Sequence, residues 1–188
     1  MKKVSLILCG LIMLPIFIFA QHNEQTTTDD TVKETKNFPA QFSVFYPSFA
    51  THGERSTDYT FNFSLNLLYG KIGGLNGVEI SGLVGRVVDD VNGVQIACFG
   101  NGAANVSGIQ IGGLGNRAAD VSGIQISALG NSAANVHGLQ IGGLGNGAAN
   151  VNGLQIGCMY NRTEKLNGLQ IGLVSVNDTV KKDFLLAS

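Results

Sequence analysis

The chain has 188 residues with 12 basic and 13 acidic side chains, which gives a formal net charge of −1. Charged residues make up only 13% of the chain, and 26 residues are glycine. The balanced charge, without a basic stripe, argues against nucleic acid as a partner. Glycine at this frequency argues against long helices, because each glycine in a helix interior costs up to about 1 kcal/mol.

The first twenty residues have the pattern of a secretory signal peptide. Lys2 and Lys3 precede an uncharged apolar run that closes at Ala20, so we expect cleavage before Gln21 and export through the Sec pathway. The destination is the periplasm, the cell surface or the medium. Residues 21–37 are polar and rich in threonine, which predicts a disordered tether.

Residues 38–74 contain the most aromatic part of the mature chain. The stretches 42–46 and 59–68 alternate apolar and polar residues, which predicts two strands joined by a polar segment around Gly53. We expect these residues to form an N-terminal β cap over the repeats that follow.

Residues 75–176 repeat with a period of fifteen. In each unit a Gly is followed by one variable residue and then by Gln and Ile. The first unit has Glu79 in place of Gln, and one additional residue is inserted near Asp89. A short fixed period is the signature of stacked coils, and Gly, Ser and Asn every five residues favour sharp turns. The sequence predicts an all-β fold: a β-solenoid (triangular β-helix) of about seven 15-residue coils. Residues 177–188 are expected to form a C-terminal tail or cap.

Two other architectures are less favoured. A helical repeat fails because fifteen residues are not a whole number of turns at about 3.6 residues each. An outer-membrane β-barrel would suit the near absence of charge between Val91 and Asn161. It would, however, need strands of about 9–11 residues and girdles of Tyr or Trp, and Tyr160 alone is of these types within the repeats.

Within a coil, apolar and small residues form three pairs with one residue between the members. In the unit 106–120 and its successor the pairs are Ile109 with Ile111, Leu114 with Asn116, and Ala119 with Val121, and we expect all six to point inward. The intervening Gln would then point outward. The predicted outward ladder consists of Gln95, Gln110, Gln125, Gln140, Gln155 and Gln170. The predicted inward ladder consists of Asn101, Asn116, Asn131, Asn146 and Asn161.

These two ladders are given different roles. The inward Asn ladder is structural, since its amides can bond from coil to coil. The outward Gln ladder either stabilises the stack through hydrogen bonds between coils or forms a flat binding face for a polymer such as a glycan.

Other candidate sites are weak. Cys98 and Cys158 lie four coils apart, about 19 Å, so we expect free thiols that act as small apolar fillers rather than a disulfide. His137 is a lone candidate for hexapeptide-type acyltransferase chemistry, and Asp120 has no regular Asp ladder around it for calcium. No catalytic residue, metal site or cofactor is predicted, and the lack of Thr between Val91 and Asn161 disfavours ice binding.

The segment FNFSLNLLYGKIGGLNGVEISGLVG, followed by tandem GVQI and GLQI units, resembles the surface-repeat-containing proteins of Gram-negative bacteria. The resemblance covers residues 61–176. It implies an exported repeat protein of the cell envelope or surface, in a family with no catalytic residues to carry over.

The predicted function is therefore a non-catalytic structural or interaction module of the envelope. Its partner would be a glycan or a surface protein, and self-association through the solenoid ends is a further option. The alternative is a secreted, fibre-forming matrix protein, because GNGAAN units after a Gln resemble curlin repeats of functional amyloid. The aromatic cap and the charged tail at Lys181, Lys182 and Asp183 argue against polymerisation.

Overall fold

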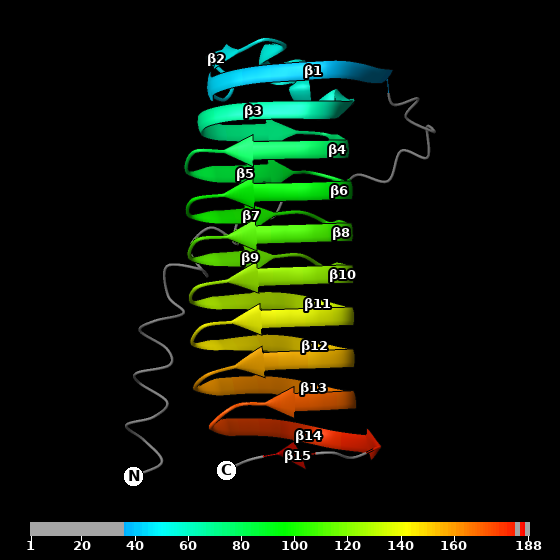
Figure 1. Cartoon of the computed structure of the whole chain (residues 1–188). Coiled ribbons are helices and arrows are strands. Elements are labelled where there is room, and N and C mark those ends of the chain that lie inside the picture. Colours follow the sequence, from blue (N-terminus) through cyan, green and yellow to red (C-terminus); the bar gives the residue numbers. More distant parts are fainter. Residues whose placement is uncertain (1–35, 183–184, 187–188) are drawn as a thin grey trace. The chain divides into compact units, whose positions relative to one another are not determined.

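The computed structural model describes residues 36–182 and 185–186. Of these residues, 78% lie in strands (Figure 1). The strands are β1 (Lys36–Phe45), β2 (Phe49–Ala50), β3 (Tyr59–Ile72), β4 (Gly74–Ser81), β5 (Val84–Val87), β6 (Asp90–Ala97), β7 (Gly100–Gly102), β8 (Asn105–Gly112), β9 (Gly115–Arg117), β10 (Asp120–Ser127), β11 (Gly130–Gly142), β12 (Gly145–Gly157), β13 (Tyr160–Ile171), β14 (Val174–Lys182) and β15 (Leu185–Leu186). One 3₁₀ helix, Gly53–Asp58, joins β2 to β3. The described residues include no helix of the length and hydropathy needed to cross a membrane.

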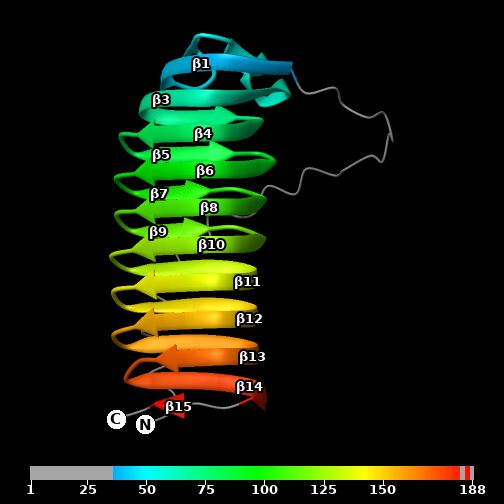
Figure 2. The same cartoon turned by 45° about the vertical axis from the view of Figure 1, so that its right-hand side comes forward.

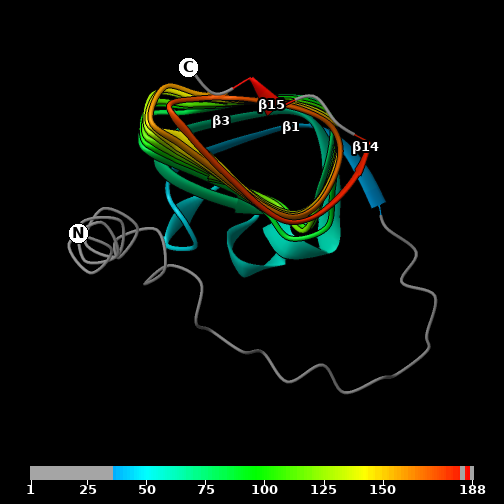
Figure 3. The same cartoon turned by 90° about the horizontal axis from the view of Figure 1, so that it is seen from below.

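The strands stack in parallel, each in register with the strand one coil away. Val106 pairs with Val121, which pairs with Val136, so the register is fifteen residues throughout this region. Figures 1 and 2 show β4, β6, β8 and β10 one below another, with β5, β7 and β9 in a second row. Seen from below, the coil is a rounded triangle (Figure 3). The predicted β-solenoid is therefore confirmed.

The stacking begins one coil earlier than the sequence analysis placed it. β3 pairs in parallel with β4 and β5, from Thr60 opposite Gly74 to Ile72 opposite Val87, and so completes a coil of its own. The solenoid has about eight turns rather than seven. β1 lies in parallel on β3, and the short antiparallel strand β2 follows it.

Glycine is required at one corner of every coil. The backbone of Gly138 has φ 146°, and a Cβ there would lie 2.1 Å from the carbonyl oxygen of Gly123 in the preceding coil. Gly93 has φ 148° and would meet the carbonyl of Gly77 at 2.0 Å. Only glycine adopts this conformation readily, which explains why a glycine stands two residues before every Gln.

The apolar core is narrow. It is one column of buried aliphatic residues, continued at the N-terminal end by Phe61 and flanked by Val87, Ala118 and Ala133. The column comprises Leu75, Val91, Val106, Val121, Val136, Val151 and Leu166. The rest of the interior is filled by polar side chains, so hydrophobic burial alone does not hold the coils together.

The predicted direction of several side chains is wrong. Asn116 and Val121 point inward as expected, but Ile109, Ile111, Leu114 and Ala119 lie on the outside. The alternation that starts at the buried Val106 continues through the glycine corner, because the backbone stays extended there. Gln110 therefore points inward, and its two Ile neighbours point outward.

Candidate functional site

The six Gln residues predicted to form an outward binding ladder are buried instead. Gln95, Gln110, Gln125, Gln140, Gln155 and Gln170 are all 0% exposed. Each amide donates to the Gln of the preceding coil: Gln110 Nε2 to Gln95 Oε1 at 2.7 Å, and Gln125 Nε2 to Gln110 Oε1 at 2.8 Å. The same bond continues to the last Gln. The Gln ladder is thus an interior hydrogen-bonded stack and presents no face to a glycan.

A buried carboxylate begins this ladder. Gln95 Nε2 donates to Glu79 Oε2 at 2.6 Å, and Asn66 Nδ2 donates to Glu79 Oε1 at 2.9 Å. Burial raises the pKa of Glu79 to about 7, and the hydrogen bonds from Gln95 and Asn66 oppose that rise. The stacked amides all point their N–H groups toward Glu79, which is the direction that favours a negative charge.

The two ends of the ladder have unpaired groups. Gln170 Oε1 is buried and has no hydrogen-bond partner among the described residues. Gln41 on β1 belongs to the same column, since Gln41 lies opposite Ser64 and Ser64 opposite Glu79. Both amide atoms of Gln41 are buried and unpaired in the described part of the chain.

The Asn ladder points inward, as predicted. Asn116 Nδ2 donates to Asn131 Oδ1 at 2.9 Å and to the carbonyl of Ile126 at 2.7 Å. The same pair of bonds is made by Asn101, Asn131 and Asn146, and Asn161 bonds the carbonyl of Ile171. Each Asn donates toward the C-terminal end, whereas each Gln donates toward the N-terminal end. The dipoles of the two ladders therefore oppose each other.

The residues on either side of each Gln form the outer surface of the same strands. These residues form two of the three columns of a surface that we name the apolar face. Ile80 (41% exposed) and Ile111 (38% exposed) are typical members. The first column contains Val78, Val94, Ile109, Ile124, Leu139, Leu154 and Leu169. The second contains Ile80, Ile96, Ile111, Ile126, Ile141, Ile156 and Ile171. Phe63 and Leu65 of β3 continue the two columns.

A third apolar column lies along the adjoining corner of the coil and belongs to the apolar face. Leu114 N, for example, donates to the carbonyl of Phe99 one coil before, at 2.7 Å. Phe99 is 50% exposed and Met159 52% exposed. The column contains Leu68, Leu83, Phe99, Leu114, Leu129, Leu144 and Met159. None of the residues named in the three columns carries a charge.

Charged side chains lie on the other two sides of the coil. Arg86 and Arg117 are exposed and belong to one column, and Asp120 and Lys165 are exposed and belong to another. The exterior is therefore divided into one uncharged, aliphatic side and two polar sides. An exposed apolar patch of this extent is more often a surface that contacts a partner than a surface that stays in contact with water.

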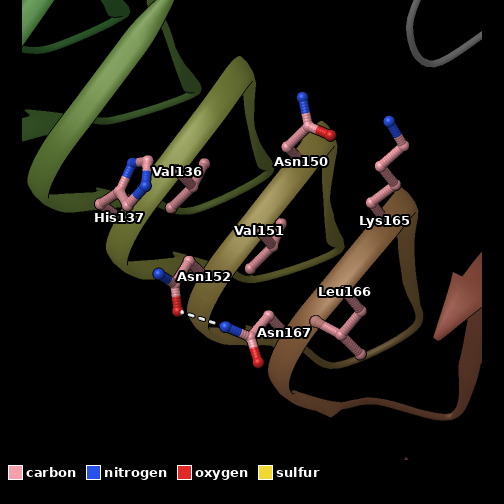
Figure 4. A pocket seen from close by; sticks show the side chains of 8 residues that line it. All are labelled: Val136, His137, Asn150, Val151, Asn152, Lys165, Leu166 and Asn167. Carbon is pink, nitrogen blue, oxygen red and sulfur yellow. Dashed lines mark hydrogen bonds between the residues drawn. The ribbon is translucent and has the colours of Figure 1, made fainter. Parts of the chain in front are cut away.

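The remaining candidate groups do not form a reaction site. A hollow of about 150 Å³ runs along β11, β12 and β13 beside the exposed His137 (Figure 4). It is lined by Val136, Val151 and Leu166 and by the polar residues around them, including Asn167, whose Nδ2 donates to Asn152 Oδ1 at 3.1 Å. Small-molecule sites usually offer about 300–1,000 Å³. The described residues contain no group of three or more His, Cys, Asp or Glu side chains placed to hold a metal ion.

The two cysteines are free, as predicted, but they are not buried fillers. Cys98 and Cys158 are both exposed at the corner beside the apolar face. The corner turns the side chain of this position outward, as it does for Leu114 one residue further along the coil.

Comparison with known proteins gives no relative. No protein-family model, curated protein or solved structure matches this chain.

Proposed function

We propose that the protein is a non-catalytic exported repeat protein that serves as a structural or interaction module of the bacterial cell envelope or surface. The observation that carries the proposal is the apolar face, a long uncharged surface on a solenoid held by two internal amide ladders. The secretory pattern of residues 1–20 and the resemblance to surface-repeat-containing proteins support the location. Residues 1–35 lie outside the described residues.

The location is tested by expressing the complete chain in a Gram-negative host. We expect the mature protein to begin near Gln21 by mass spectrometry and to appear in the periplasmic, surface or medium fraction. Full-length protein that stays in the cytoplasm would refute the exported module.

The contact role is tested with two charge substitutions on one strand. Ile126→Lys places a charge on the apolar face, whereas Ser122→Lys places the same charge on a polar side of β10. Chemical cross-linking in the envelope fraction should lose its adducts with Ile126→Lys and keep them with Ser122→Lys. Identical adducts from both variants would contradict a contact role for this face.

A fibre-forming matrix protein is the second candidate, and the unpaired amides at the ladder ends favour it. If one chain followed another end to end, Gln41 Nε2 of the second would be placed to donate to Gln170 Oε1 of the first, in the direction that the ladder already has. β15 stands against this, because it pairs with β13 at Gln170 and Ile171 and so covers the last coil.

Truncation tests this candidate. A chain of residues 21–182, which lacks β15, should sediment as fibres that bind thioflavin within days, while residues 21–188 should stay in solution. Fibres from the 21–188 chain would make the matrix role the better reading, and fibres from neither chain would remove it.

A further inference from the structure

We propose that the apolar face is covered by a second copy of this chain, packed face to face about a two-fold axis. The inference rests on the proposed contact role of that face and names its partner. It concerns the outer Ile and Leu columns and is independent of the ladder ends that end-to-end growth would use.

The size of the face suits a pair of this kind. Eight strands, from β3 to β13, contribute to it, and at about 4.8 Å per strand they extend about 38 Å. The flat part of the face, from Val94 to the end of β6 at Ala97, is four residues or about 13 Å of extended chain, and the corner column lies at the bend beyond it. A face-to-face pair would then cover about 500 Å² of each copy and about 1,000 Å² in total, which reaches the lower limit for a specific interface.

The shape of the face also suits a second sheet. Its first and second columns consist of Val, Ile and Leu, and the distance between neighbouring side chains in a column is the distance between stacked strands. Sheets pack face to face at about 10 Å with interdigitating side chains when both present rows of this kind. A two-fold axis brings the same rows from both copies together, and it closes the assembly at two chains.

The charge distribution of the face is compatible with a like partner. The column beside the face across the glycine corner is neutral or polar, with Ser107, Ser122 and Asn152 among its members. Beyond the third column, the next exposed column carries Arg86, Arg117 and Arg162. These charges lie outside the three apolar columns, so two identical uncharged faces meet without like-charge repulsion between the buried columns.

The test is the mass of the mature chain in solution. Sedimentation equilibrium of residues 21–188 between about 1 and 100 µM should give twice the chain mass at the upper end, with a reversible transition. Ile126→Lys lies near the middle of the face and should weaken the pair at least about 100-fold, since two buried charges would be introduced per pair. Ser122→Lys should leave the dissociation constant unchanged. Circular dichroism of both variants must match that of the parent chain, and Ile156→Lys serves as a second probe of the face.

Several results would overturn the proposal. A chain that stays monomeric at about 100 µM, or a dimer that resists both Ile126→Lys and Ile156→Lys, would do so. So would a monomer that binds neutral phosphatidylcholine vesicles through the face and loses this binding in Ile126→Lys, because the occupant would then be lipid. A dimer in solution with the protein retained in the cytoplasm would refute the exported module and leave the pairing intact.

Discussion

Glu79 gives the protein a pH dependence that one substitution should remove. Its carboxyl group is fully buried, with a pKa raised from 4.5 to about 7 by that burial. Between these two pH values the folded chain holds a proton that the unfolded chain has lost. Folding stability should therefore be highest below about pH 4.5 and should fall as the pH rises through 7.

The size of the effect follows from the pKa change. A rise from 4.5 to about 7 corresponds to about 3 kcal/mol lost from the free energy of unfolding on going from pH 4 to pH 8. Glu79→Gln removes the titrating group and extends the Gln ladder by one rung. Asn66 Oδ1 has no partner among the described residues, so a rotated Asn66 amide can accept from the new Gln side chain.

Urea unfolding followed by circular dichroism at pH 4 and pH 8 measures this. We expect Glu79→Gln to be more stable than the parent chain by up to about 3 kcal/mol at pH 8 and similar to it at pH 4. Glu164→Gln, a substitution at an exposed carboxyl group, is the matched control and should follow the parent chain. A Glu79→Gln chain that loses as much stability between pH 4 and pH 8 as the parent chain would refute the reasoning.

Two further substitutions test the packing of the coils. Gly138→Ala should cost at least about 3 kcal/mol in urea unfolding, because its Cβ would strike the Gly123 carbonyl and its backbone conformation suits only glycine. Gly147→Ala, where no heavy atom lies within 4 Å of the added Cβ, should change stability by less than about 0.5 kcal/mol, and equal losses would contradict this account. Gln125→Ala breaks the ladder in its middle and should cost about 3 kcal/mol or more, since a buried donor and a buried acceptor both lose their partner. A thermal unfolding midpoint equal to that of the parent chain would show that this rung is dispensable.

The architecture could be predicted from the period, whereas the direction of the side chains could not be predicted from hydrophobicity. Ile109 and Ile111 were expected inside because aliphatic residues are usually buried. The triangular interior is narrow, however, and flat amides that bond from coil to coil fill it while satisfying their own polar groups. Because Ile109 and Ile111 were assigned to the interior, no apolar face on the exterior was predicted.

A signal for the correct direction was present in the repeats themselves. The Gln position does not vary from coil to coil after Glu79, while its aliphatic neighbour changes among Val94, Ile109 and Leu139. A polar side chain that bonds its own copies in the coils above and below must stay the same, which suits Gln to the interior. The Ile that follows each Gln is equally constant although it lies outside, so constancy indicates an interior position only for the polar residue. The unpaired amides of Gln41 and Gln170, by contrast, depend on where the stack ends, which the repeat pattern does not state.

The central claim is that Gln lies inside each coil and the aliphatic residues outside. Hydrogen exchange of the Gln side-chain amides, followed by NMR on the ¹⁵N-labelled mature chain, tests it most directly. If the ladder is internal, these amide protons should exchange at least about 100-fold more slowly than those of a free Gln side chain. Exchange of the ladder amides at the rate of a free side chain would place Gln on the surface and contradict the account.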